Sequence, residues 1–370
     1  MKVVFRTDSS LMIGTGHLMR CLALAGELSA RGEQVVFICR NLPGNMNTQV
    51  LRNGHKLHEL PLDDNTLMDN PDISEYERWL AVEEETDALQ TGRVLAEKEN
   101  HADVLVVDHY ALDSAWERQM LPYIKRLMVI DDLANRCHDC HILLDQNLYE
   151  DMEKRYEHLV GADTQLLLGP TFALLRKEFN SQRKVMAKRD GRVRKVMVSF
   201  GGADRTNETL KFLNALKKAK TGALNFEVIV GKTNPNNNII KEKCDSMSNV
   251  AYHRAVDDIA RLMAMVDLAV GAGGTSTWER CCLGLPAVTV AVAENQVEVA
   301  RLSERMGFAV YLGISEQVSA DRMIKYVAEL AEDRPKMLAM SSAGMKLVDG
   351  LGVNRVCDIL YAARGVNKYS

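Results

Sequence analysis

The stretch KVVFRTDSSLMIGTGHLMRCLALAGEL, residues 2–28, joins a short apolar run to a glycine-containing loop and then to a segment with helical periodicity. The run Lys2–Arg6 predicts a buried strand, and the apolar residues within 18–28 recur at the spacing of one helix face. Gly14 and Gly16 lie between them, where a tight turn suits a residue without a side chain. A strand, a loop and a helix in this order form half of a βαβ unit, so the stretch predicts an α/β fold.

The same alternation of Val- and Ile-rich runs with helical patterns continues along the chain, as parallel strands and crossover helices require. A length of 370 residues suits two domains better than one core. The clearest predicted strands are Lys2–Arg6, Gln34–Cys39, Asp103–Asp108, Leu127–Asp131, His141–Leu144, Lys195–Phe200, Phe226–Val230, Leu268–Gly271 and Ala287–Val292. We therefore predict two Rossmann-like domains, residues 1–168 and 195–335, with a linker at 169–194 and a helical extension at 336–370.

Two charged segments carry no recognisable motif. The basic tract QRKVMAKRDGRVRK, residues 182–195, overlaps the predicted linker, and we interpret it as a solvated segment. Residues Glu75–Lys98 are acidic and have a helical pattern. Neither segment indicates a function from its sequence.

Composition and charge exclude several classes of protein. The chain is 46% hydrophobic and 26% charged, which is typical of a globular protein. Its 46 Lys and Arg residues against 50 Asp and Glu residues give a net charge of −4, which argues against a nucleic-acid partner. No apolar run approaches the roughly 18 to 20 residues that span a bilayer, and the start of the chain lacks the pattern of a secretory signal. Because its eight cysteines are scattered, we expect reduced thiols in a cytoplasmic protein without membrane insertion.

His17 is the main catalytic candidate, because it follows the glycine loop and begins the first predicted helix. A helix N-terminus offers unpaired N–H groups and a positive field, which favours an anion and opposes protonation of an imidazole. A neutral imidazole is what a general base requires. Gly14 and Gly16 would let the backbone approach a substrate closely. The alternative is that the glycines only turn the chain and His17 only caps the helix.

The second half contains two further glycine loops that could hold a diphosphate. VSFGGADRTNETLKFLNAL, residues 198–216, places Gly201 and Gly202 between a strand and a helix predicted to begin near Asn207. This loop lacks the glycines of a dinucleotide fingerprint and the Lys of a P-loop, so no NAD, ATP or other cofactor is predicted. A purely structural turn remains open.

The other loop, VGAGGTSTWERCCLGLPAV, spans residues 270–288 and contains Gly274, Ser276 and Glu279. A Glu in the first turns of the following helix can accept hydrogen bonds from a ribose diol, although it also complements the helix dipole. AENQ, residues 293–296, places Asn295 and Gln296 at the end of the next strand, where open α/β sheets bind ligands.

Polar residues also follow three strands of the first half, and each of them could line a site or simply cap a helix or turn. They are Asp108, His109 and Tyr110, then Asp131 and Asp132, then Asp145, Gln146 and Asn147. The segment CHDCH, residues 137–141, has ligand-like spacing, but no second Cys or His pair follows at a suitable distance. We therefore predict no metal site.

Together these features resemble the GT-B architecture of nucleotide-sugar enzymes. The second half resembles the lipid II-forming glycosyltransferases of peptidoglycan synthesis. The first half is more specific, and it resembles the family of UDP-2,4-diacetamido-2,4,6-trideoxy-β-L-altropyranose hydrolases of the bacterial pseudaminic acid pathway. The resemblance extends to about residue 330. The matching motifs are RTDSSLMIGTGHLMRCLALA (6–25), VVDHYALD (106–113), IDDLANR (130–136) and CHILLDQN (140–147).

The resemblance implies two domains whose parallel sheets face across a cleft, and a metal-independent hydrolysis of the sugar C1–O bond with inversion. The products would be UDP and a free sugar, in a pathway that serves flagellin glycosylation. His17 matches the family's catalytic histidine. Tyr110 and Asn295 would line the sugar and water site, while Gly201, Gly202 and Glu279 would hold UDP.

Two other functions remain open at the level of sequence. An inverting glycosyltransferase would need the same UDP-sugar site, with a base that activates an acceptor hydroxyl instead of water. A non-catalytic sugar-nucleotide-binding protein would bind without turnover. The chain departs from the family in its insert at Glu75–Lys98 and in its C-terminal extension, so no oligomeric partner is predicted. GT-B scaffolds host several chemistries, so the fold alone does not choose among these functions.

Overall fold

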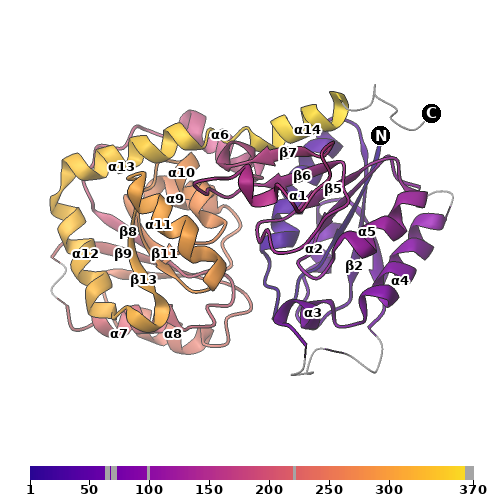
Figure 1. Cartoon of the computed structure of the whole chain (residues 1–370). Coiled ribbons are helices and arrows are strands. Elements are labelled where there is room, and N and C mark those ends of the chain that lie inside the picture. Colours follow the sequence, from indigo (N-terminus) through magenta and orange to yellow (C-terminus); the bar gives the residue numbers. More distant parts are fainter. Residues whose placement is uncertain (63–66, 68–72, 98–100, 220–221, 363–370) are drawn as a thin grey trace. The chain divides into compact units, whose positions relative to one another are not determined.

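The computed structural model describes residues 1–62, 67, 73–97, 101–219 and 222–362, and its chain forms two compact units (Figure 1). Unit 1 contains Met1–Arg176 and the C-terminal residues from Gly352, and unit 2 contains Lys177–Leu351. The parts of the predicted insert and extension at 98 and 363–370 lie outside the described residues.

The described part of unit 1 is built on a parallel sheet of seven strands in the order β3-β2-β1-β4-β5-β6-β7. The strands are β1 (Lys2–Thr7), β2 (Gln34–Arg40), β3 (Lys56–Leu60), β4 (Val104–Asp108), β5 (Leu127–Ile130), β6 (Ile142–Asp145) and β7 (Gln165–Leu168). The helices are α1 (Gly16–Ala30), α2 (Asn47–Arg52), α3 (Glu75–Leu80), α4 (Glu84–Ala96), α5 (Ser114–Met120) and α14 (Gly352–Ala362). Three short 3-10 turns are η1 (Leu121–Tyr123), η2 (Lys154–Tyr156) and η3 (Pro170–Phe172).

Helices cover both faces of this sheet, because successive strand residues point to opposite faces. Val3 and Phe5 of β1 pack into a core with residues of α1 and α14, whereas Val4 packs with residues of α4 and α5 on the other face. The near-continuous burial of β1 and β4 follows from this sandwiching. Unit 1 is therefore a doubly wound three-layer structure.

Unit 2 repeats the plan with the strand order β10-β9-β8-β11-β12-β13, so both described sheets follow the Rossmann order 3-2-1-4-5-6. Its strands are β8 (Lys195–Ser199), β9 (Asn225–Val230), β10 (Val250–Arg254), β11 (Leu268–Ala272), β12 (Ala287–Ala291) and β13 (Ala309–Ile314). Its helices are α6 (Lys177–Val185), α7 (Glu208–Leu216), α8 (Asn237–Asp245), α9 (Ile259–Met265), α10 (Ser276–Cys282), α11 (Val297–Arg305), α12 (Ala320–Glu332) and α13 (Arg334–Leu347), with 3-10 turns η4 (Glu294–Gln296) and η5 (Ser315–Gln317).

The division between the units falls between Arg176 and Lys177, inside the predicted linker. Its basic tract is not simply solvated, so that interpretation is wrong. Arg183 donates to the carbonyl oxygens of Cys282 and Val348 at 2.7 Å and of Met345 at 2.9 Å. Arg189 donates to the carbonyl oxygens of Leu283, Val266 and Met263. Burial lowers the pKa of Arg189 to about 10. These arginines satisfy carbonyl groups near helix C-termini, which have no partner within the helix.

The C-terminal segment is divided between the two units instead of forming a separate extension. Helix α13 packs on α10 in unit 2, where an added methyl group on Gly344 would lie 3.2 Å from Cys281. Helix α14 packs on α1 in unit 1, where Asn354 donates to Glu27 at 3.0 Å. Burial of its apolar face, and not sequence position, decides where α14 belongs.

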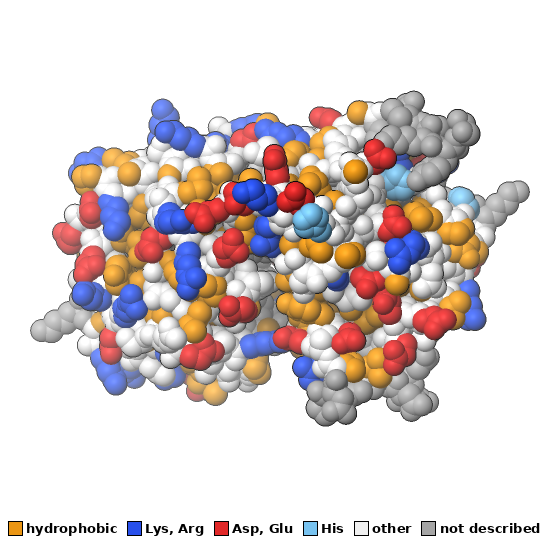
Figure 2. Space-filling model, viewed as in Figure 1, with side chains coloured by type: hydrophobic (Ala, Val, Ile, Leu, Met, Phe, Trp, Pro, Cys, Tyr) orange, Lys and Arg blue, Asp and Glu red, His pale blue; other side chains and the backbone are white. Residues whose placement is uncertain are grey.

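No helix within the described residues is long and apolar enough to cross a membrane. On the face shown in Figure 2, Lys and Arg side chains are mixed with Asp and Glu side chains over both units. This mixing agrees with the small net charge and shows no broad basic area on that face.

Candidate active site

The glycine loop with His17 follows β1, and Asp108 is the last residue of β4. These two strands are neighbours at the centre of the unit 1 sheet, and the chain connections leave them in opposite directions. Ligands of open α/β sheets bind at such a switch point, beyond the carboxyl ends of the strands. The sequence therefore places His17 and Asp108 at the position where this fold class forms its sites.

The Gly14–His17 segment has the local structure that the sequence predicts. Gly14 has a φ of +79°, and its N–H donates to the Ser10 carbonyl at 2.9 Å, which closes the turn. No atom lies within 4 Å of a Cβ placed on Gly14 or on Gly16, so both glycines border open space. The N-cap residue Thr15 makes no side-chain hydrogen bond to the start of α1.

His17 contacts the Asp108 carboxylate, with its Nδ1 2.6 Å from Oδ1. The His17 side chain is 10% exposed and the Asp108 side chain is fully buried. Burial alone would raise the pKa of Asp108, but Arg20 and His17 hold it far below its usual range. An ionised carboxylate accepts a hydrogen bond, so the proton of a neutral imidazole lies on Nδ1 and leaves Nε2 as an acceptor. This is the tautomer that a general base needs.

Arg20 fixes the same carboxylate from one helical turn away. Its Nε lies 2.6 Å from Asp108 Oδ2 and its Nη2 2.7 Å from Oδ1, which is a bidentate pair. Its Nη1 reaches Asp132 Oδ2 at 3.1 Å. The spacing of three residues puts His17 and Arg20 on one face of α1, so both meet Asp108. Arg20 therefore links the carboxylates at the ends of β4 and β5.

Asp132 in turn holds Tyr110, whose hydroxyl donates to Asp132 Oδ1. Asn147 donates to the other oxygen of Asp132 at 3.2 Å. The ring of Tyr110 lies edge-to-face with the His17 imidazole, with centroids 4.5 Å apart. The predicted site residues His17 and Tyr110 are thus in contact, and strand-end residues of β4, β5 and β6 support them.

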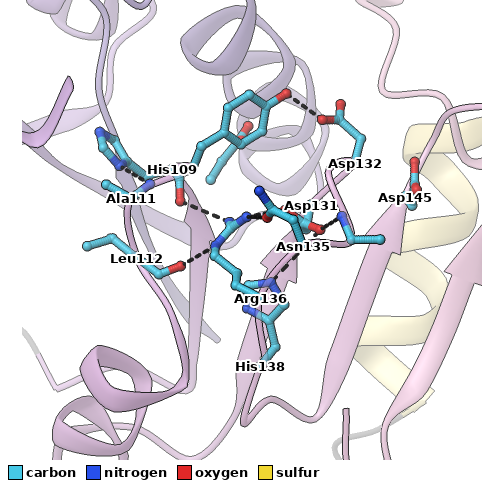
Figure 3. A network of polar contacts seen from close by, with 12 residues as sticks. His109, Ala111, Leu112, Asp131, Asp132, Asn135, Arg136, His138 and Asp145 are labelled. Carbon is cyan, nitrogen blue, oxygen red and sulfur yellow. Dashed lines mark hydrogen bonds and ion pairs between the residues drawn. The ribbon is translucent and has the colours of Figure 1, made fainter. Parts of the chain in front are cut away.

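A second layer of contacts keeps this edge of the sheet in place. Arg136 pairs with Asp131 Oδ1 at 2.8 Å and donates to the Leu112 carbonyl at 2.8 Å (Figure 3). Burial acts to raise the pKa of Asp131, but the charges of Arg136 and His138 lower it. His138 also forms a hydrogen bond with Glu117, with Nδ1 2.6 Å from Oε1.

Asp145 differs from Asp108 and Asp131 in the direction of its pKa shift. Burial and the neighbouring Asp132 carboxylate raise the pKa of Asp145 to about 8. The hydrogen bonds agree, because the Tyr156 hydroxyl has one proton but lies 3.0 Å from Asp145 Oδ2 and 3.1 Å from Asp131 Oδ2. If Asp145 is protonated, it donates a hydrogen bond to the Tyr156 hydroxyl, which in turn donates to Asp131, so both carboxyl groups have a hydrogen-bond partner.

In unit 2, Gly201 and Gly202 follow β8 as predicted, and both are exposed. The predicted helix is α7, but the Asp204 carboxylate already caps it, accepting from the Glu208 N–H at 2.9 Å and the Thr209 N–H at 3.0 Å. The start of α7 is therefore not a free anion cradle. Any phosphate at this loop would use the N–H groups of the loop itself.

The second predicted loop of unit 2 lies beyond the neighbouring strand β11. Gln296 lies against it, since a Cβ on Gly274 would be 3.7 Å from Gln296 Nε2. Ser276 and Glu279 are half-buried in α10, and Asn295 is exposed. The structure thus brings Gly274 and Gln296 together, beyond the carboxyl ends of the neighbouring strands β11 and β12.

Within the described residues, no group of three or more His, Cys, Asp or Glu side chains is arranged to hold a metal ion. In the CHDCH segment, His138 contacts Glu117, and His141 Nδ1 accepts the Leu127 N–H at 3.0 Å. Cys137 is exposed and Cys140 is buried. The two histidines of the segment are thus engaged in hydrogen bonds with neighbouring residues.

The chain is similar in sequence to several known proteins. Residues 196–351 match the glycosyltransferase family 28 C-terminal domain. The chain is 26% identical to the UDP-2,4-diacetamido-2,4,6-trideoxy-β-L-altropyranose hydrolase of Campylobacter jejuni over 314 residues, 84% of this chain and 98% of that protein. It is 27% identical to the spore coat polysaccharide biosynthesis protein SpsG of Bacillus subtilis over 215 residues, 58% of this chain, and spans only 62% of SpsG. The resemblance predicted from the motifs is therefore confirmed.

Solved structures show the same fold along the whole chain. The UGT89C1 of Arabidopsis thaliana complexed with UDP-L-rhamnose has a TM-score of 0.67 at 13% identity and covers 97% of this chain and 98% of its own. MurG of Acinetobacter baumannii has a TM-score of 0.62 at 13% identity and covers 98% and 99%. The chain thus has the α/β GT-B fold, and its second unit matches the C-terminal domain of glycosyltransferase family 28.

Proposed function

We propose that the protein hydrolyses the C1–O bond of UDP-2,4-diacetamido-2,4,6-trideoxy-β-L-altropyranose, with inversion, in the biosynthesis of pseudaminic acid. The observation that carries the proposal is the contact of 2.6 Å between His17 Nδ1 and the buried Asp108 carboxylate. The similarity to the Campylobacter jejuni hydrolase supplies the substrate. The contact belongs to unit 1, and the similarity extends over 314 residues of the chain.

In the proposed reaction His17 Nε2 takes a proton from water as the water oxygen forms a bond to C1. The bond from C1 to the β-phosphate oxygen breaks, and its electron pair leaves with UDP. The Asp108 carboxylate stabilises the imidazolium that forms, because the two groups are 2.6 Å apart and shielded from solvent. The proton then passes to solvent, which restores the neutral base.

Unit 2 would bind the UDP group through Gly201, Gly202, Gly274, Ser276 and Glu279. The N–H groups of the two glycine loops would stabilise charge on the departing diphosphate, which makes a metal ion unnecessary. Glu279 would accept hydrogen bonds from the ribose. Gly14, Gly16, Tyr110, Asn295 and Gln296 would contact the sugar and the attacking water.

An inverting glycosyltransferase is the second candidate, and the match to glycosyltransferase family 28 favours it. It would use the same base on an acceptor hydroxyl. Incubation with the UDP-sugar alone, in water enriched in oxygen-18, separates the two functions. We expect free sugar and UDP in equal amounts, with the label in the sugar. A stable UDP-sugar without an added acceptor would contradict hydrolysis, and label in UDP would contradict cleavage at C1.

A further inference from the structure

The acidic insert, which has no motif in its sequence, contributes two aromatic side chains that pack around Tyr110, and one of them also contacts His17. They lie on α3, which is fixed at both ends. At its start the Ser74 hydroxyl accepts from the Glu77 N–H at 3.2 Å, and the Glu77 carboxylate accepts from the Ser74 N–H at 2.8 Å, which is a capping box. At its end Leu80 and Ala81 are buried in the core of unit 1.

Tyr76 and Trp79 are three residues apart and therefore share one face of α3. Trp79 stacks on Tyr110, with ring centroids 5.5 Å apart and planes inclined at 25°. Tyr76 packs edge-to-face against both rings, at 5.0 Å from Trp79 and 5.2 Å from Tyr110. Trp79 also lies edge-to-face with the His17 imidazole at 6.0 Å. We call Tyr76, Trp79 and Tyr110 the aromatic wall.

The aromatic wall is partly exposed to solvent, unlike the residues of a hydrophobic core. Tyr110 is buried, but Tyr76 and Trp79 keep part of their surface exposed. The other two tryptophans, Trp116 and Trp278, are 0% and 1% exposed. Partly exposed aromatic surface beside a candidate base is the kind of surface that binds the apolar face of a ligand.

We propose that Tyr76 and Trp79 select the sugar, by packing against the apolar face and methyl groups of the hexose on which His17 acts. A general base must lie within hydrogen-bond reach of the water that attacks C1, so the hexose must lie within a few ångströms of His17. The ring centroids of Tyr110 and Trp79 are 4.5 and 6.0 Å from that of His17, so the hexose would also lie beside these two rings. The preferred substrate class is a UDP-hexose that carries deoxy and acetamido groups in place of hydroxyls. This inference rests on the proposed function for the position of the sugar.

The fluorescence of Trp79 can report on binding, and comparison with a Trp79→Phe variant separates its signal from those of Trp116 and Trp278. The experiment uses the full chain with His17→Asn, which prevents turnover, and follows tryptophan fluorescence during titration with the UDP-diacetamido sugar, UDP-N-acetylglucosamine and UDP. We expect a change with the diacetamido sugar that is absent with UDP and is lost in His17→Asn/Trp79→Phe. A change that survives Trp79→Phe, or an equal response to UDP, would overturn the inference.

Affinity measured by calorimetry gives the second test. Trp79→Ser should weaken binding of the diacetamido sugar about tenfold, the loss of a few apolar contacts, and leave UDP affinity unchanged. Trp79→Phe should restore most of the binding. Tyr326→Ser, which changes a partly exposed aromatic residue of unit 2, is the matched control. Equal losses for the sugar and for UDP, accompanied by a lower melting temperature, would show that Trp79 only packs α3.

The two proposals fail separately. Absence of hydrolysis by the wild-type chain, with a normal Trp79 response to the sugar, would remove the proposed function and keep the wall as a sugar site. Normal hydrolysis with no Trp79 response and no loss of affinity in Trp79→Ser would remove the wall and keep the proposed function.

Discussion

A histidine at the start of a helix is often a capping residue, and what distinguishes His17 is the buried carboxylate that faces its Nδ1. Asp108→Asn keeps the size of the side chain and removes its charge. We expect kcat to fall by on the order of 10² to 10⁴, because neither the tautomer nor the imidazolium is then stabilised. KM should change little. Asp139→Asn, at an exposed carboxylate 3.8 Å from Arg118, is the control, and an equal effect in both variants would contradict the role of Asp108.

Asp145 supports a prediction about pH. Its pKa is raised to about 8 in the folded state, so between about pH 4 and 8 the folded chain holds a proton that the unfolded chain has released. The contribution of Asp145 to stability is therefore complete below pH 4 and is lost as pH rises through 8. From pH 5 to pH 7.5, the free energy of unfolding measured with denaturant should fall less in Asp145→Asn than in the wild type. Equal pH dependence in the two proteins would contradict a protonated Asp145.

The sequence identified His17 and Tyr110, and the structure places them in contact. It named Asp108 and Asp132 only as strand-end residues that could line a site or cap a turn, and it did not name Arg20, which contacts both of them. A strand-end Asp is equally common as a cap, so only the meeting of three strand ends in space distinguishes the two roles. The sequence signals that exist are the spacing of Arg20 from His17 and the repeated Asp at strand ends.

At the scale of elements, Arg183 holds the ends of two helices of unit 2 through three carbonyl oxygens. Arg183→Met should lower the stability of unit 2 by about 2 kcal/mol, since hydrogen bonds from a charged donor are lost and the carbonyls stay partly buried. The melting temperature should fall by roughly 4 to 8 °C. Lys184→Met, at an exposed neighbouring side chain, provides the comparison. A similar melting temperature for the two variants would indicate that the basic tract is a solvated segment after all.

The elements that sequence reasoning overlooked share one property. The nine predicted strands are all present, and the four that were not identified are β3, β7, β10 and β13. Each of them is an edge strand of its sheet. Edge strands are only partly buried, as the burial of β3 and β10 shows, so they lack the continuous apolar run that reveals a central strand. The packing of helix α14 on α1 was not predicted either, because the residues in contact lie more than 300 positions apart in the chain.

At the scale of the whole molecule, the proposed function requires backbone N–H groups of unit 2 to bind the diphosphate. Activity should therefore survive EDTA, because the charge of the leaving group is stabilised without a cation. Hydrolysis is measured with and without the chelator on the same preparation. Activity that disappears on chelation and returns with Mg²⁺ or Zn²⁺ would contradict this part of the account.

The central claim is that His17 activates water for cleavage of the UDP-sugar, and the most direct measurement is the rate of UDP release by folded His17→Asn. Removal of a general base costs about 10² to 10⁴ in rate, so turnover should fall by that factor while UDP affinity and melting temperature stay close to those of the wild type. Near-normal UDP release by a folded His17→Asn chain would contradict the account.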